Sequence, residues 1–339
     1  MKKLLLFILT TVLAFTTIFS LGCNNESDEN LSLYTPDGAP ALSVARLIYD
    51  KTIIDNLDIN VVSANLITSF VAGGESKADF AILPVNVASK VLGSGENYLL
   101  LGAVTHGNLF IMKKQSGVNI SKKNLTELVG KKVGVINLAN VPGLTFKAIL
   151  ADNNIDYVNI GESEYDANKV NLIGLSNGTE VVPNSECDYF VVPEPAATTK
   201  QNATGGKLAI AGSLMSLYGA GNGYPQAVLV AKKSVVSKNP KTVQKLLDSF
   251  SENKAWLTDE NTKSETIVNS VVSAFVDSET APTFNANNLN VTVINNCAIN
   301  FVSAQDVKND AKNYIAKLNL ISNNAWGNMK EEFFYNYKK

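Results

Sequence analysis

Short runs of β-branched and aromatic residues alternate with segments of helical periodicity in the first third of the chain. Residues 32–34, 59–62, 80–83 and 98–104 have the apolar character of buried strands. Apolar positions spaced three and four apart predict a helix over residues 41–49. Strands that alternate with helices are typical of βαβ units, so the pattern predicts an α/β lobe with a mostly parallel sheet.

The same alternation continues in a second unit further along the chain. Residues 109–112 lead into this unit, in which strands are expected at residues 132–136, 188–192 and 208–211 and a helix over residues 141–150. Glycines at residues 219–223 interrupt this pattern, and residues 224–230 are again typical of a strand. From Asn239 onward the chain is expected to be mainly helical, with Asn239 as N-cap and Pro240 at the first helical position.

The chain begins with the features of a bacterial export signal. Lys2 and Lys3 precede an uncharged, largely apolar stretch over residues 4–21. This stretch ends at Cys23 in a sequence that resembles a lipobox, although Ser20 stands where leucine is favoured. We therefore expect cleavage before Cys23 and acylation of its thiol, with palmitate among the attached chains, and residues 24–30 as a tether. An uncleaved anchor is the alternative, because about 18 apolar residues can just span a bilayer.

Both alternatives place the rest of the chain outside the cytoplasm, at the periplasmic or extracellular side of the cell membrane. Removing residues 1–22 takes away two lysines and no acid, which changes the formal net charge from −2 to −4 and argues against nucleic acid as a partner. The remaining length favours two lobes, because single cores stop growing near ~250–300 residues. Cys187 and Cys297 lack CxxC spacing, and both a disulfide and two buried thiols are compatible with the sequence.

Seven short segments together resemble a known family. They are Tyr-Thr-Pro-Asp-Gly-Ala-Pro-Ala at 34–41, Gly-Glu at 74–75 with Asp-Phe-Ala-Ile-Leu-Pro at 79–84, Gly-Lys-Lys-Val-Gly-Val at 130–135, Pro-Glu-Pro-Ala at 193–196, Tyr-Pro-Gln-Ala at 224–227 and Lys-Lys-Ser at 232–234. Their order and spacing resemble the nitrate/sulfonate/thiamine-precursor (pyrimidine) family of ABC-transporter substrate-binding proteins. The similarity extends over nearly the whole chain after the export signal.

The resemblance implies a type II periplasmic-binding-protein fold, in which two α/β lobes are joined by two crossing hinge segments. These segments are expected near residues 107–114 and 223–230, with residues 31–110 and 226–339 in lobe 1 and 111–225 in lobe 2. Closure of such lobes buries a ligand and creates the surface that a permease recognises. The implied function is extracytoplasmic solute binding for an ABC importer, as a monomer without a cofactor and with permease and ATPase subunits as partners.

Ligands of open α/β sheets bind beyond the carboxyl ends of strands, where loops enter helix N-termini. Residues 35–39 occupy such a position in one predicted lobe, and the amide-bearing loop at residues 137–143 occupies the equivalent position in the other. Thr105 and His106 end a strand just before the proposed hinge. The candidate ligand contacts are Tyr34, Thr35, Asp37, Gly38, Ala39, Asn86, Thr105, His106, Asn137, Asn140 and Tyr224.

Structural roles for these residues remain open alternatives. Asp37 is equally suited to capping the following helix, and asparagines such as Asn137 and Asn140 are ordinary turn residues. A lone histidine such as His106 is more often a structural hydrogen-bonding residue than a ligand contact. Tyrosines at strand ends either stack on a flat ligand ring or belong to the core.

The arginine content restricts the class of ligand. Arg46 is the only arginine, and it lies inside the first predicted helix instead of at a strand end. A bidentate guanidinium clamp for a carboxylate is therefore not expected, which disfavours amino acids. Heterocycles such as pyrimidines or flavin-like rings remain, together with small anions held by backbone N–H groups.

Few features of the sequence support an enzymatic activity, and we expect a protein that is not an enzyme. Residues 174–178 match the G-x-S-x-G pattern of exported hydrolases, but no histidine follows Ser176 to act as the base. A pyrimidine-synthesising enzyme of related fold consumes its own histidine, and the export signal and the single His106 argue against that activity. One histidine and two scattered cysteines predict no dedicated metal site. A receptor or adhesin module outside transport stays open.

Overall fold

The computed structural model describes residues 29–73, 76–95, 97–219 and 223–336. The predicted export signal, Cys23 and residues 24–28 of the tether lie outside the described residues. In the part of the chain that is described, no helix has both the length and the apolar character needed to cross a bilayer.

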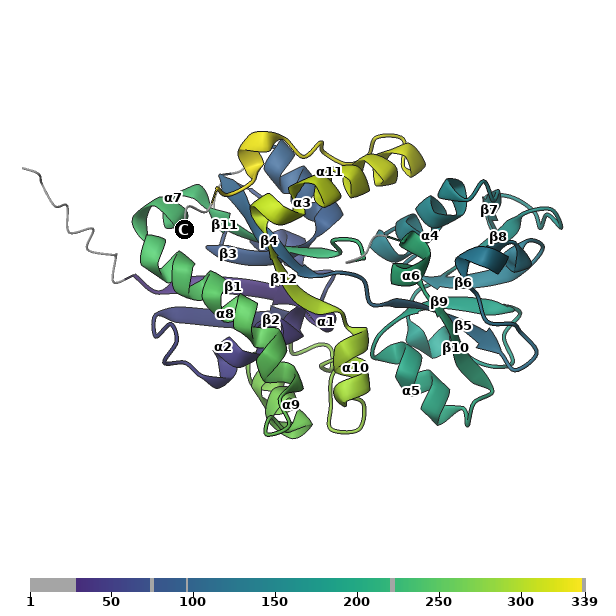
Figure 1. Cartoon of the computed structure of the whole chain (residues 1–339), viewed down its shortest axis with the longest axis horizontal. Helices are drawn as coiled ribbons and strands as arrows, with labels where there is room; N and C mark the ends of the chain where they lie inside the picture. Colours follow the sequence, from purple (N-terminus) through teal and green to yellow (C-terminus); the bar gives the residue numbers. More distant parts are fainter. Residues whose placement is uncertain (1–28, 74–75, 96, 220–222, 337–339) are drawn as a thin grey trace, which may run out of the picture.

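Two six-stranded sheets form the centres of two lobes (Figure 1). The first sheet has the strand order β12-β4-β11-β3-β1-β2, and the second has the order β10-β5-β9-β6-β8-β7. The first contains β1 (Leu31–Pro36), β2 (Leu57–Val62), β3 (Phe80–Pro84), β4 (Tyr98–Thr105), β11 (Ala227–Lys232) and β12 (Ile299–Ser303). The second contains β5 (Leu109–Lys114), β6 (Lys132–Ile136), β7 (Tyr157–Asn159), β8 (Val170–Leu175), β9 (Tyr189–Pro193) and β10 (Leu208–Ser213).

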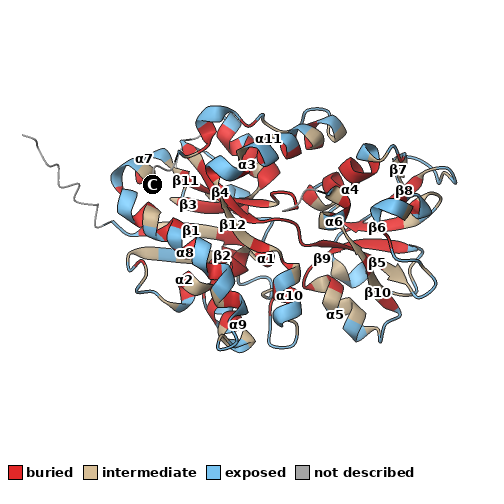
Figure 2. Cartoon of the chain, viewed as in Figure 1, coloured by how far each residue is buried: buried red, intermediate tan, exposed pale blue. Residues whose placement is uncertain are grey.

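Helices cover these sheets, so the central strands are apolar on both faces. Beside the first sheet lie α1 (Ala39–Leu42), α2 (Ala45–Tyr49), α3 (Val85–Gly93), α7 (Lys233–Lys238), α8 (Pro240–Thr258), α9 (Ser264–Ser273), α10 (Val291–Asn296) and α11 (Ala304–Ile321). Beside the second lie α4 (Val141–Asp152), α5 (Ala196–Ala203) and α6 (Leu214–Tyr218). The 3₁₀ turns are η1 (Ile67–Phe70), η2 (Lys122–Leu128), η3 (Gly178–Glu180) and η4 (Glu331–Phe333). Figure 2 shows the buried strands inside and the exposed helix faces outside.

Two short segments carry the chain between the lobes, one between β4 and β5 and the other between α6 and β11. They run side by side, because the amide N–H of Gln226 donates to the Thr105 carbonyl at 2.9 Å. The side chains of Gln226 and Asn108 add a second link: Gln226 Nε2 donates to Asn108 Oδ1 at 2.7 Å, and the Asn108 backbone N–H donates to Gln226 Oε1 at 3.0 Å. The two-lobed α/β architecture with two crossing segments, which the resemblance implied, is confirmed.

Both sheets are mixed, so the prediction of mostly parallel sheets is confirmed only for part of each: β1, β2 and β3 pair in parallel in the first sheet, and β6, β7, β8 and β9 do so in the second. In the first, β11 runs antiparallel to both β3 and β4. In the second, β5 runs antiparallel to β9 and β10. The reason is topological: β4 leaves the first lobe while β11 enters it, and neighbouring strands that cross in opposite directions must pair antiparallel.

Some element boundaries also differ from the sequence-based expectation. The helix expected at 41–49 is divided into α1 and α2, and at the division Ser43 Oγ donates to the Pro40 carbonyl at 2.5 Å. Such a bond competes with continued helix. Strands β5, β7, β8 and β12 were not named as strands in the sequence-based expectation, and β12 interrupts a region predicted as mainly helical.

Candidate functional site

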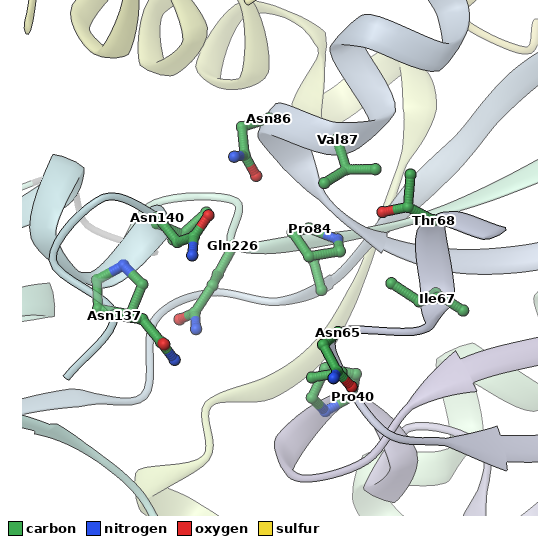
Figure 3. A pocket seen from close by; sticks show the side chains of 14 residues that line it. Pro40, Asn65, Ile67, Thr68, Pro84, Asn86, Val87, Asn137, Asn140 and Gln226 are labelled. Atoms are coloured by element: carbon green, nitrogen blue, oxygen red, sulfur yellow. The ribbon is translucent and has the colours of Figure 1, made fainter. Parts of the chain in front are cut away.

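A cavity of about 470 Å³ lies between the two lobes (Figure 3). Its walls come mainly from the loops and first helical turns that follow β1, β2, β3 and β6, and therefore from the carboxyl ends of strands in both sheets. The described residues that line it are Pro40, Ala64, Asn65, Ile67, Thr68, Pro84, Asn86 and Val87 from the first lobe, Asn137, Asn140, Val141 and Pro142 from the second, and Gln226 and Ala227 at the returning segment. A volume of this size is typical of small-molecule sites.

Two helices begin at this cavity, one from each lobe. Pro84 is the N-cap residue of α3 and Asn140 that of α4, and neither N-terminus has a side-chain capping hydrogen bond. The first N–H groups of a helix have no partner within the helix and carry partial positive charge. The Val85 N–H already donates to the Gln226 carbonyl at 3.0 Å and Pro142 has no N–H, so the donors that these helices can offer are the other N–H groups of their first turns.

The loop before α4 is held in one tight conformation. Asn137 has a left-handed backbone with φ of 56°, which asparagine tolerates better than most residues. Its N–H donates to the Leu175 carbonyl at 2.9 Å, and its own carbonyl accepts from the Asn140 N–H at 2.9 Å. A Cβ on Gly143 would lie 1.9 Å from the Leu138 oxygen, so only glycine lets the loop fold so closely over the first helical turn.

Asn86 faces this loop from the opposite lobe, in the first turn of α3 (Figure 3). Its side chain is 2% exposed, and its Oδ1 atom has no hydrogen-bond partner among the described residues. Buried polar atoms in folded proteins are paired in the great majority of cases. Of the buried side-chain atoms without a partner among the described residues, this oxygen is the one that belongs to a residue of the cavity wall.

The cavity wall carries no formal charge: among its described residues there is no aspartate, glutamate, lysine, arginine or histidine. Arg46 lies on α2, where it forms an ion pair of 2.5 Å with Glu252. The wall combines four asparagines, a glutamine and a threonine with prolines and aliphatic side chains. This combination suits a small solute with a partly apolar body and several hydrogen-bonding atoms.

Three of the predicted contact residues line the cavity, namely Asn86, Asn137 and Asn140. The predicted loop after β1 contributes only Pro40 to the wall. Asp37 binds within the protein, since its carboxylate accepts from the N–H groups of Gly38 and Thr283, both at 2.7 Å. Tyr34 stacks on Phe70 with ring centroids 4.3 Å apart.

The remaining predicted residues also lie outside the cavity wall. Thr35, Gly38 and Ala39 are buried around the start of α1. At the hinge, Thr105 Oγ1 accepts from the Ala227 N–H at 3.1 Å, and His106 Nε2 donates to the Asn300 carbonyl at 3.0 Å.

Burial sets the ionisation behaviour of the hinge residues. Burial lowers the pKa of His106, and it raises the pKa of Tyr224 well above the usual value. Tyr224 stacks on Tyr314 of α11 with ring centroids 5.2 Å apart. Contact of these residues with a ligand stays a prediction.

Three polar wall residues were not predicted: Asn65, Thr68 and Gln226. Asn65 and Thr68 follow the carboxyl end of β2, so the strand-end rule that selected the other loops applies to them as well. Gln226 belongs to the segment 224–227 that carries part of the family resemblance.

The other sequence motifs have structural explanations. Ser176 of the G-x-S-x-G match donates its backbone N–H to Glu180 Oε1 at 2.7 Å, within a turn capped by Asn177. Cys187 and Cys297 are free, buried thiols, and burial raises the pKa of each. No cluster of three or more histidine, cysteine, aspartate or glutamate side chains suited to a metal ion occurs in the described part of the chain.

Comparison with known proteins gives a consistent picture of the fold. No family model matches the chain, and no curated protein matches it. Among solved structures, an ABC transporter protein from Parabacteroides distasonis has a TM-score of 0.70 at 15% identity, covering 91% of this chain and 99% of that one. The periplasmic aliphatic sulphonate binding protein of Escherichia coli has a TM-score of 0.61 at 12% identity, covering 92% and 94%.

A third solved structure, the zinc-bound ligand-binding component of an ABC-type import system from Staphylococcus aureus, has a TM-score of 0.59 at 11% identity, covering 91% and 96%. Two of the three are described as proteins of ABC transport systems and the other as a periplasmic binding protein, and each aligns with this chain over nearly its whole length. The chain therefore has the two-lobed fold of the substrate-binding proteins of ABC transporters, and its cavity lies between the lobes.

Proposed function

We propose that the chain is the extracytoplasmic solute-binding component of an ABC importer and that it binds a small molecule in the cavity between its lobes. The observation that carries the proposal is the position of this cavity: strand-end loops of both sheets line it, beside the segments that join the lobes. A molecule that bonds Asn86 on one side and Asn140 on the other stabilises the closed arrangement, because those contacts exist only when the lobes are together.

Binding without chemical conversion agrees with the residues of the cavity wall. General acid–base catalysis requires a titratable group within hydrogen-bond reach of the substrate. The described wall residues supply carboxamides and one hydroxyl, that of Thr68, and no side chain that titrates near neutral pH. We therefore propose that the ligand leaves the protein unaltered.

Delivery to a transporter requires a location outside the cytoplasm. The positively charged start, the apolar stretch over 4–21 and Cys23 support export followed by lipid anchoring. A monomer tethered in this way presents the outer rims of both lobes to the permease, and the ATPase subunits are partners through the permease.

Native mass spectrometry of freshly purified protein tests the binding function, followed by small-angle X-ray scattering before and after removal of bound material. We expect one retained small molecule per chain, recovered with unchanged mass after prolonged incubation. We also expect a smaller radius of gyration in the loaded state. Conversion of the molecule during incubation would contradict the proposal.

A matched pair of variants links the result to the cavity. Asn140→Ala removes an amide from the cavity wall, whereas Asn313→Ala removes an exposed amide from α11. Only the first is expected to lose the retained molecule. Equal retention by both variants would place the ligand elsewhere.

The partner assignment has its own test. Membranes from the source cells, solubilised in mild detergent, should yield a permease and an ATPase together with the affinity-tagged full chain. Recovery of the chain with a signalling receptor and without these subunits would contradict a role in import.

A further inference from the structure

Two carboxamides at the cavity differ in how their hydrogen bonds are satisfied. Gln226 is paired within the protein, since its Nε2 and Oε1 both bond to Asn108. Asn86 is buried to the same degree as a core residue, with 2% exposure, yet its Oδ1 is unpaired. Asn65, Asn137 and Asn140 are exposed, so water can satisfy their amides. Asn86 is therefore the wall amide that depends on the ligand.

A carboxamide offers one acceptor and one donor group side by side, whichever way round its two atoms are assigned. A sulfonate, nitrate or carboxylate ligand supplies acceptors only, so it can satisfy the Nδ2 group of Asn86 and leaves the oxygen unpaired. A molecule with an N–H or O–H donor beside a carbonyl satisfies both. Sites built to hydrogen-bond a donor reject analogues that lack it, because a buried group is left without a partner.

The rest of the wall agrees with an uncharged occupant. The side chains of the described lining residues carry no formal charge to balance a charged occupant, and the N-termini of α3 and α4 supply only partial positive charge. Ile67, Val87 and Val141 give the cavity apolar surfaces that suit a ring or an aliphatic body. The uncapped N-terminus of α4, on the opposite wall, offers N–H donors to a second carbonyl.

From the unpaired oxygen of Asn86 and the uncharged wall, we propose that this cavity selects an uncharged molecule with an N–H donor next to a carbonyl, as in a lactam, cyclic ureide or cyclic imide. The donor bonds Asn86 Oδ1 and the neighbouring carbonyl accepts from Asn86 Nδ2. This inference rests on the proposed binding function, and it names Asn86 as the residue that determines specificity.

An unpaired buried oxygen destabilises the ligand-free protein, so Asn86→Ala should weaken ligand binding without lowering stability. Substitution of a merely structural residue would lower stability as well. The unfolding temperature of the ligand-free variant should equal or exceed that of the wild type. Its affinity for a cyclic ureide should nevertheless fall about 10-fold to 100-fold, which corresponds to about 1.4–2.8 kcal/mol. Asn86→Asp, which keeps the shape and removes the donor, should lose affinity as well. Asn313→Ala should behave as the wild type in both measurements.

The test is a thermal-shift screen followed by calorimetric titration with three sets of probes. The first set contains lactams, cyclic ureides and imides with a free N–H, the second contains the same rings with the nitrogen methylated, and the third contains nitrate, alkanesulfonates and benzenesulfonate. We expect protection of the wild type by members of the first set only, and loss of that protection in Asn86→Ala.

The other outcomes separate a failure of the proposed ligand class from a failure of the proposed binding function. Protection by the anions, with equal affinity in wild type and Asn86→Ala, overturns the ligand class and leaves the binding function intact. Equal protection by methylated and unmethylated rings overturns the role of Asn86. Protection by no set, in a protein that also retains no small molecule in native mass spectrometry, counts against the binding function itself.

Discussion

Gly143→Ala tests how the fold builds the second wall of the cavity. The added Cβ would lie 1.9 Å from the Leu138 oxygen, and separations below 3.0 Å essentially never occur. The loop at residues 137–140 or the first turn of α4 must therefore move by more than 1 Å. Overpacking of this kind costs about 1–3 kcal/mol. Replacing glycine in a helix by alanine regains up to about 1 kcal/mol, so the net loss of stability should be about 0–2 kcal/mol.

The effect on binding should be larger than the effect on folding. A displacement of more than 1 Å takes the amides of Asn137 and Asn140 out of hydrogen-bonding position, and each lost bond to a buried partner costs about 1–3 kcal/mol. An affinity loss of about 10-fold or more is therefore expected. Urea unfolding measures the loss of stability, and calorimetric titration with the molecule recovered from the wild-type protein measures the loss of affinity.

Gly178→Ala is the matched control, because a Cβ there would meet only the Ala196 Cβ at an ordinary 3.8 Å. It should leave stability and affinity close to those of the wild type. If Gly143→Ala keeps wild-type affinity, the loop geometry does not position the ligand and the reasoning is refuted.

Three further predictions concern the hinge, the lobe contact and the anchor. Burial holds the pKa of His106 below its unfolded value of about 6.5, so the stability that depends on neutral His106 is present above that pH and is lost as the pH falls towards the folded pKa. His106→Gln should therefore show a smaller decrease in urea midpoint than the wild type between pH 7 and pH 5. An unchanged decrease would argue against His106 as the origin of the pH dependence. Asn296 Nδ2 donates to Glu194 Oε1 across the two lobes at 2.7 Å. Asn296→Ala should therefore enlarge the radius of gyration of the ligand-free protein in X-ray scattering. A scattering curve identical to that of the wild type would contradict a role of this bond in lobe contact. Cys23→Ser should release the chain from the membrane fraction, whereas a chain that stays membrane-bound would indicate an uncleaved anchor.

Elements with continuous apolar character were predictable from local sequence. The strand expected at 132–136 coincides with β6, and the helix expected from 141 begins there as α4. Strand β12 was not predictable, because four of its five residues are only partly buried and the strand exists through pairing with β4, nearly 200 residues earlier in the chain. Its pairing partner cannot be inferred from a local window.

The site was partly predictable for the same reason. The strand-end rule placed Asn137 and Asn140 at the cavity, since it depends only on a local strand, loop and helix. It failed to exclude Asp37 from the wall, because the partner that occupies the Asp37 carboxylate is the Thr283 N–H, 246 positions away. Likewise, the unpaired oxygen of Asn86 follows from three-dimensional burial and leaves no trace in the sequence.

A crystal structure of the full chain, purified with its retained small molecule, would show which molecule binds between the lobes and which residues it contacts. We expect a single uncharged molecule between the lobes, with an N–H group within hydrogen-bond distance of Asn86 Oδ1 and a second polar contact to Asn137, Asn140 or the first turn of α4. A molecule bound outside this cavity, or an anion in the cavity with Asn86 Oδ1 still unpaired, would contradict this expectation.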